Sequence, residues 1–215
     1  MEALQLGFIA AFLQLSGYFF YSSKVLKHDI IPNPTSWLMF AYGTTFLAII
    51  EWDRDASFAL LALPVACSFA SIAVAIYALR GVRSWFPEHR ADRFSFGFDV
   101  FLTLVYLSTW LLLISNLIAE GQKDVADIVI LACWNIGVLT AFFPLLRQVY
   151  KHPESEHATP WIIWTSAYAA LTIATYLEVG AFNELMLYPL INLVVHGFIA
   201  IHTARDHIKR GVSFI

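Results

Sequence analysis

Seven long apolar runs alternate with short polar stretches along the chain. We place them at about residues 3–22, 35–51, 57–79, 96–118, 126–147, 160–178 and 184–203. Each run is close to the roughly 20 mostly apolar residues that a helix needs to cross the hydrocarbon core of a bilayer. Because unpaired strands would leave backbone groups without partners in lipid, the pattern predicts an all-α integral membrane protein with seven transmembrane helices.

The composition supports a membrane protein over a water-soluble domain. The 215 residues are 59% hydrophobic and 13% charged, whereas soluble domains average about 45–50% apolar and about 25% charged residues. Cys67 and Cys133 each lie inside an apolar run, so we expect small buried side chains and no disulfide, metal or cofactor site. The sequence has no basic cluster with interleaved aromatic residues, so we expect no nucleic-acid partner. The first run lacks a basic leader and is long for a signal peptide, so we expect it to remain as a helix.

The positive charges collect on one side of the predicted helices. Only Arg54 and Lys123 lie on the side of the N-terminus, and the other 11 of the 13 Lys and Arg residues, Arg83 among them, lie on the opposite side. Cytoplasmic loops carry the excess of Lys and Arg in membrane proteins. The pattern predicts an outer N-terminus and a cytoplasmic C-terminus. The termini carry no targeting tag, which favours a bacterial plasma (inner) membrane.

One polar segment occurs twice. "KHDIIPNPTSW" (27–37) matches "KHPESEHATPW" (151–161) at an offset of 124 residues. This offset aligns the first two predicted helices with the fifth and sixth, and a slip of one residue then places Pro64 on Pro189 in the third and seventh. We expect two three-helix repeats, with the fourth helix as the extra crossing that lets both run in the same direction. The expected units are 1–82 (first repeat), 83–124 (cytoplasmic loop and linker helix) and 125–215 (second repeat).

The expected architecture resembles the PQ-loop and SWEET superfamily, which has two parallel three-helix bundles joined by a linker helix. The resemblance is carried most specifically by "FFPLLRQVYKHPESEHATPWIIW" (142–164), with Pro144 ahead of a basic stretch and Pro160 opening the sixth helix. The chain departs from the family pattern, since Leu145 follows Pro144 in place of glutamine and Phe20 stands where the first half would have a proline. The resemblance implies that prolines let helix ends swing. The candidate hinges are Pro34, Pro64, Pro144, Pro160 and Pro189.

Polar side chains at bilayer depth are costly and are functional candidates by default. We expect Gln14, Asn135, Asn192 and His196 to bind a solute near the middle of the membrane. Asn192 and His196 are four residues apart and therefore share one face of the seventh helix. Pro189 removes a backbone donor just before them, so we expect the helix to be loosened there. Hydrogen bonding between helices is the alternative role for each of these side chains.

Aromatic and acidic residues give further candidates. Trp164 and Tyr168 lie deep in the sixth helix, and their rings could line a cavity and stack on a sugar or a heterocycle. Trp37 and Trp161 lie near helix ends and better fit a belt at the membrane surface. Asp99 is expected at the cytoplasmic boundary of the fourth helix.

The sequence favours transport over catalysis. It has no Gly-rich phosphate loop, no HExxH motif and no Ser-His-Asp or Cys-His set, and the last predicted helix lacks the lysine of a retinal photoreceptor. We expect a transporter, not an enzyme, that moves a small polar solute, sugar-like or similar, by alternating access between the two repeats. The alternatives are a vitamin or nucleoside-type carrier, as in the PnuC family, and a receptor without transport activity, as in the KDEL receptors. Such a receptor would bury several charges, and the sequence places almost none in mid-membrane. The expected partners are the solute, the bilayer and, as a further candidate, a second copy of the chain.

Overall fold

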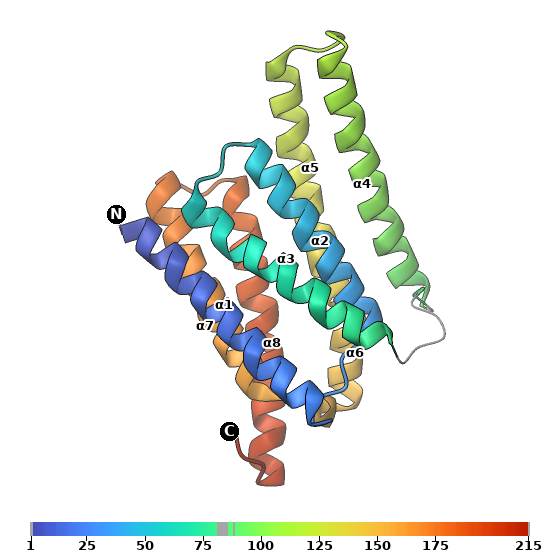
Figure 1. The fold of residues 1–215 in the computed structure, drawn as a ribbon, viewed down its shortest axis with the longest axis vertical. Helices are drawn as coiled ribbons and strands as arrows, with labels where there is room; N and C mark the ends of the chain where they lie inside the picture. The colour runs from blue at the N-terminus through green and yellow to red at the C-terminus, as the bar shows by residue number, and fades with distance from the viewer. Residues whose placement is uncertain (1, 81–85, 88, 215) are drawn as a thin grey trace.

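The structure is a computed structural model that describes residues 2–80, 86–87 and 89–214. These residues form helices and no strands, as the sequence predicts (Figure 1). The helices are α1 (Glu2–Leu26), α2 (Pro34–Asp53), α3 (Phe58–Leu79), α4 (Arg90–Ile114), α5 (Glu120–Ala141), α6 (Phe143–Lys151), α7 (Ala158–Val179) and α8 (Leu187–Arg210). Two short 3-10 turns, η1 (Pro153–Ser155) and η2 (Glu184–Met186), precede α7 and α8.

Six helical segments in the described residues are long and apolar enough to cross a membrane, as in a multi-pass membrane protein. They include α1, α3, α4 and α7, the continuous stretch of α5 and α6, and α8 with η2. The helix α2 forms where the sequence predicts it but is not among the six. Its last turn carries Glu51 and Asp53, and its remainder is rich in Ser, Thr and Gly, which lowers its hydropathy.

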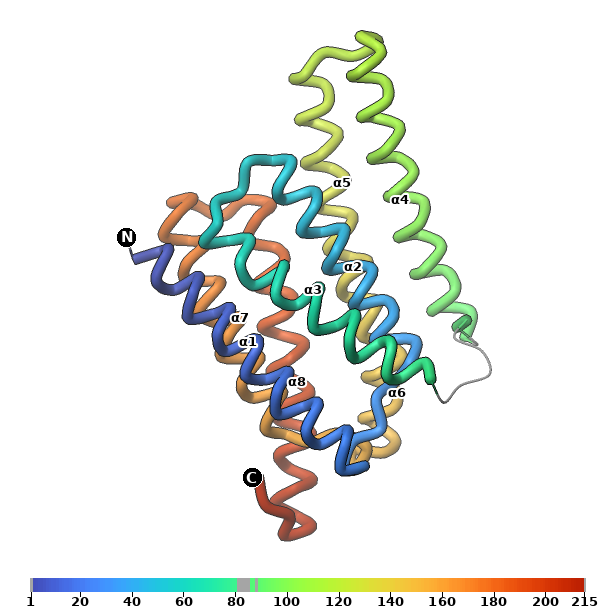
Figure 2. The backbone as a smooth tube through the Cα atoms, in the orientation of Figure 1, coloured from blue at the N-terminus to red at the C-terminus, as the bar shows by residue number. Residues whose placement is uncertain are grey.

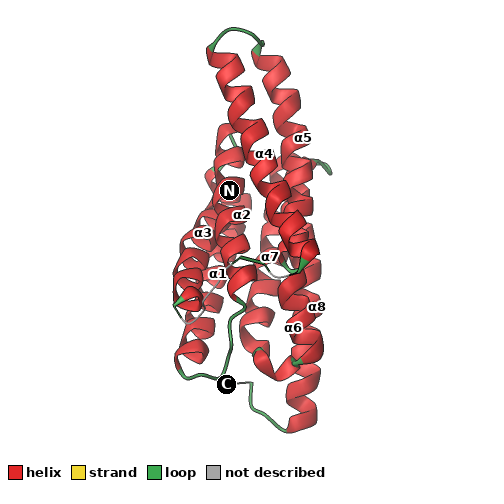
Figure 3. Cartoon of the chain, turned by 90° about the vertical axis from the view of Figure 1, so that its right-hand side faces the viewer, coloured by secondary structure: helices red, strands yellow, loops and turns green. Residues whose placement is uncertain are grey.

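The helices form a closed ring in the order α1, α3, α2, α5, α8, α7 (Figures 1 and 2). In each half of the chain the third helix packs against the other two: α3 contacts α1 and α2, and α8 contacts α5 and α7. The halves meet where α1 packs on α7 and α2 packs on α5. The helix α4 lies outside the ring against α5, and the turn between α4 and α5 extends past the other helices (Figure 3).

The boundaries of the fourth and fifth predicted helices are wrong by about six residues. The helix α4 begins at Arg90 and ends at Ile114, since the charged residues of its first turn are helical and His89 caps it by accepting from the backbone N–H of Ala91. The predicted fifth helix consists of two helices, because α5 ends at Ala141 and α6 begins at Phe143. A helix predicted from its apolar run starts too late when its first turn is charged, as in α4. The expected unit boundary after residue 124 falls inside α5, while that after residue 82, together with Arg83, lies outside the described residues.

Most of the candidate hinge prolines lie where a helix begins. Pro34, Pro144, Pro160 and Pro189 are in the first turns of α2, α6, α7 and α8, where a backbone N–H has no acceptor within the helix. Pro64 alone among the candidates lies inside a helix, α3. The expectation that Pro189 loosens the helix around Asn192 is therefore wrong, because α8 starts only two residues before this proline and continues unbroken.

Candidate functional site

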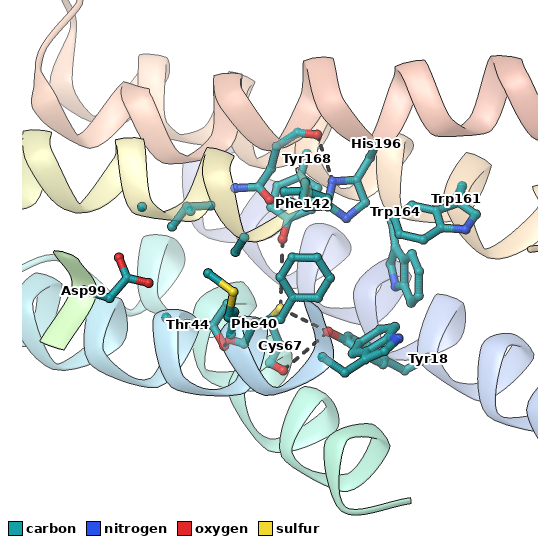
Figure 4. A pocket seen from close by; sticks show the side chains of 17 residues that line it. Tyr18, Phe40, Thr44, Cys67, Asp99, Phe142, Trp161, Trp164, Tyr168 and His196 are labelled. Atoms are coloured by element: carbon teal, nitrogen blue, oxygen red, sulfur yellow. Dashed lines mark hydrogen bonds between the residues drawn. The ribbon is translucent and has the colours of Figure 1, made fainter. Parts of the chain in front are cut away.

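A cavity lies inside the ring, between the two halves of the chain (Figure 4). All the long helices, α1 to α5, α7 and α8, contribute to its lining. About 30 Å³ of it is open to the centres of water-sized molecules. One water requires roughly 10–15 Å³ on this measure, so the cavity has room for about two waters.

Four of the six predicted binding residues line this cavity, namely Trp164, Tyr168, Asn192 and His196. Gln14 and Asn135 are buried but do not belong to the lining. The backbone carbonyl of Gln14 accepts from Trp164 Nε1 at 3.1 Å, and Asn135 Nδ2 donates to a backbone carbonyl of its own helix at 2.8 Å. These two residues support helix packing beside the cavity.

The Asn192 and His196 pair shares the face of α8 that the spacing predicts. His196 Nδ1 lies 2.9 Å from the backbone carbonyl of Asn192. A carbonyl oxygen only accepts, so Nδ1 carries the proton and the other ring nitrogen of the neutral imidazole, Nε2, is left as an acceptor. The imidazole packs among aromatic rings, with its centroid 4.7 Å from that of Tyr168 and 5.1 Å from that of Phe142.

Trp37 and Trp161 do not form a belt at the membrane surface, and that interpretation is wrong. Both are almost fully buried and line the cavity. Their indole N–H groups are held inside the protein, because Trp37 Nε1 donates to Tyr21 Oη and Trp161 Nε1 donates to Glu156 Oε2, each at 3.0 Å. A tryptophan in the first turn of a helix suits either location, and the sequence does not reveal these acceptors.

Glu156 joins the two halves of the chain behind the lining residue Trp161, at what we call the Glu156 end. It lies between η1 and α7 and is 1% exposed. Besides the bond from Trp161, its carboxyl accepts from Tyr21 Oη at 3.2 Å. Burial raises the pKa of Glu156 to about 8, although both hydrogen bonds act in the opposite direction. Glu156 in the second half therefore binds a residue of the first half. Sequence reasoning missed it, since it looks like any polar residue of the repeated segment.

Ion pairs join the two halves of the chain at the opposite end of the helices, which we call the Lys123 end. Lys123 Nζ lies 2.6 Å from Asp127 Oδ2 and also pairs with Asp53 of α2. Arg54 Nη2 lies 2.6 Å from Glu184 Oε1. Residues of the first half thus pair with residues of the second half at this end as well. The sequence shows these charges but not that they face one another.

Asp99 is the acidic residue of the cavity lining, and its expected place at a membrane boundary is wrong. It is the tenth residue of α4 and is 2% exposed. Because α4 begins six residues earlier than predicted, Asp99 lies more than two turns inside the helix. A carboxyl inside a run of Phe, Val and Leu is the signal that could have identified it.

Tyr18 and Cys67 are further lining residues that sequence reasoning did not propose. Tyr18 Oη lies 2.5 Å from Ser71 Oγ and 3.2 Å from Cys67 Sγ. Cys67 is the residue that the repeat aligns with Asn192, and both face the cavity from opposite halves of the chain.

The chain matches no protein-family model, no curated protein and no solved structure.

Proposed function

We propose that this chain is a membrane transporter that moves a small polar solute by alternating access between its two three-helix units. The observation that carries the proposal is the cavity at the interface of α1–α3 with α5–α8, lined from both units. Transporters built from repeats bind their solutes at this kind of interface near the middle of the membrane. In each unit the third helix packs against the other two, which supports the expected SWEET-like arrangement of parallel bundles.

The contacts that join the two halves of the chain at these two ends support a cycle of opening. At the Glu156 end, a second-half carboxyl binds a first-half tyrosine, Tyr21. At the Lys123 end, Asp53 and Arg54 of the first half pair with Lys123 and Glu184 of the second half. Breaking one set of contacts while the other remains would expose the cavity to one side only.

The four candidate residues in the cavity lining have positions that suit solute binding. Asn192 offers its amide oxygen and His196 its Nε2, while Trp164 and Tyr168 offer ring faces. A carrier for a vitamin or nucleoside is a second candidate. It is favoured by the density of rings around the cavity, where Phe40 and Phe142 pack with centroids 4.5 Å apart and Trp161 and Trp164 with centroids 5.0 Å apart.

The receptor alternative gains one argument from the structure. Buried charged side chains suit a receptor, and Glu51, Asp92, Asp99, Lys123, Asp127 and Glu156 are all buried, although of these six only Asp99 lines the cavity. Most of them pair with other residues of the chain. These pairs join the two halves or hold α4 against the other helices. A receptor would bind a ligand without moving it.

Solute flux through the purified chain in liposomes tests the proposal. The solutes are radiolabelled sugars, nucleosides, vitamins, amines and amino acids, compared with liposomes that lack protein. We expect uptake of one class that falls roughly tenfold or more in Asn192→Ala, since loss of a buried hydrogen bond to a ligand costs about 1.5 kcal/mol or more. Ile201→Ala, an exposed site on the same helix, is the control. Binding of a solute with no flux in any gradient would support a receptor and overturn the proposal.

A further inference from the structure

The polar face of α4 contains one carboxyl group without a partner. Polar residues recur every three or four positions along this face, so they point in one direction toward the ring. Five of the six pair with α2, α5 or α6: Asp92 with Arg147, Ser95 with Thr140, Thr103 with Tyr42, and Tyr106 and Trp110 with Asp53. The sixth is Asp99, whose Oδ1 is buried and has no hydrogen-bond partner among the described residues.

A glycine of α5 lets this carboxyl group reach the cavity from outside the ring. Gly137 lies next to Asp99 in the cavity lining. A methyl group on Gly137 would lie 2.1 Å from Asp99 Oδ1, so only glycine leaves room for the carboxyl there. In Figure 4, Asp99 lies at the end of the cavity away from Trp161 and Trp164, with Phe40 between them.

The hydrogen-bond donors of the cavity lining are largely used within the protein. The indole N–H groups of Trp37, Trp161 and Trp164 donate to Tyr21, Glu156 and the Gln14 carbonyl. The Thr44 hydroxyl donates to the Phe40 carbonyl, the Asn192 amide donates one hydrogen to the Tyr188 carbonyl, and His196 Nδ1 donates to the Asn192 carbonyl.

The polar groups left to a ligand are mainly acceptors. They are Asp99 Oδ1, the Asn192 amide oxygen and His196 Nε2, and the faces of the aromatic rings also attract positive charge. An unpaired carboxylate at this depth is costly, and a bound cation would offset that cost. An anion would meet the carboxylate and few free donors.

We infer that the cavity binds a small organic cation, an amine or quaternary ammonium compound, whose charged group pairs with Asp99 and whose apolar part packs on the aromatic rings. This inference narrows the solute class of the proposed transporter and uses the same cavity. A coordinated metal ion fits less well, since the described residues contain no group of three His, Cys, Asp or Glu side chains placed to hold one.

Matched pairs of charged and neutral probes test the inference on the full chain in detergent. The pairs are benzylamine with benzyl alcohol, and choline with its neutral carbon analogue, and glucose represents a neutral sugar. We measure thermal stability and, by calorimetry, affinity. We expect at least one cation to raise the unfolding temperature and to bind, while its neutral partner and glucose do neither. Asp99→Asn should weaken that binding by roughly thirtyfold or more, as expected when one partner of a buried charge pair is removed.

Two further variants separate binding from folding. Asp92→Asn removes a carboxylate from the same face of α4 but outside the cavity lining, so the affinity should stay within about twofold of the wild type. Gly137→Ala keeps the charge of Asp99 but displaces its carboxyl group. It should therefore weaken cation binding, and it tests the inference even if Asp99→Asn fails to fold. Equal binding of the neutral partners, no binding of any cation, or unchanged affinity in both Asp99→Asn and Gly137→Ala would overturn the inference.

The inference and the proposed transport activity fail in different ways. Flux of a neutral sugar through liposomes, without cation binding, would leave transport standing and overturn the organic-cation inference. Asp99-dependent cation binding in detergent, without flux of that cation in liposomes, would leave the inference standing and overturn transport.

Discussion

The two halves of the chain are joined by different chemistry at the two ends of the helices. At the Glu156 end, one buried carboxyl group accepts hydrogen bonds from two neutral aromatic donors, Tyr21 and Trp161. At the Lys123 end, formal charges pair with one another, and Asp53 also accepts from Tyr106 Oη at 2.9 Å and from Trp110 Nε1 at 3.1 Å. Both ends join the halves of the chain, but one depends on the protonation of a single group and the other on a network of charges.

This difference implies that the two ends respond to different conditions. A buried carboxyl group whose pKa is raised by burial becomes less stable when it ionises, because the charged form is poorly solvated in an apolar setting. A charge network keeps its pairing across neutral pH, and it fails when one of its members is removed and the others stay buried. Each end can therefore be weakened without touching the other.

Removing Lys123 should have the largest effect. Lys123→Met leaves the carboxylates of Asp127 and Asp53 facing each other without their cation, and breaking a buried charge pair costs about 3–5 kcal/mol. Thermal unfolding of the purified variant measures the loss. The control is Lys151→Met, an exposed site on α6, which should stay within about 0.5 kcal/mol of the wild type. Equal stability of the two variants would show that the charges at the Lys123 end do not hold the two halves together there.

Removing the carboxyl group at the opposite end should cost somewhat less. Glu156→Ala leaves the Tyr21 hydroxyl and the Trp161 N–H without their acceptor, and unsatisfied buried donors cost about 2–3 kcal/mol together. The matched control is Glu154→Ala, two residues away and exposed. A loss of stability no greater than that of Glu154→Ala would show that Glu156 does not hold the two halves together at this end.

The stability of the chain should fall as pH rises from about 7 to about 9. The pKa of Glu156 is raised from 4.5 to about 8, so between these values the folded state binds more protons than the unfolded state, and stability decreases with pH. His157, whose pKa is lowered by burial to about 4, is neutral in both states above about pH 7.5 and adds nothing there. The unfolding temperature should fall less steeply with pH in Glu156→Gln than in the wild type over this range. The same slope in both proteins would contradict the prediction.

The pair between Arg54 and Glu184 should give the smallest effect. The Arg54 and Glu184 side chains are 17% and 21% exposed, and a pair of this kind contributes about 1 kcal/mol or less. Arg54→Gln should therefore lower the free energy of unfolding slightly, and less so in high salt because ions screen the pair. A loss as large as that of Lys123→Met would show that the two sets of pairs at this end act as one network.

The sequence predicts the helices better than it predicts the site. Apolar runs of spanning length are set by the bilayer itself, so all seven predicted segments are helical. The boundaries shift where polar turns extend a helix, as at the start of α4 and the end of α8. The pair of Asn192 and His196 follows from helical spacing alone. By contrast, the inward position of Trp37 depends on Tyr21, and the cavity position of Asp99 depends on how α4 packs against Gly137. Such contacts join segments that are distant in the sequence, and a single sequence does not show which distant residues meet.

Side-specific labelling of Cys67 tests most directly whether the cavity opens to alternate sides. Cys67 lines the cavity, and Cys133→Ala removes the other thiol, so that a membrane-impermeant maleimide added to one side of oriented vesicles reports access. We expect slow labelling of the Cys133→Ala protein. Adding Glu156→Ala should speed labelling from one side, and adding Lys123→Met should speed labelling from the other side. Labelling from the same side in both variants, or no increase in either, would contradict this expectation.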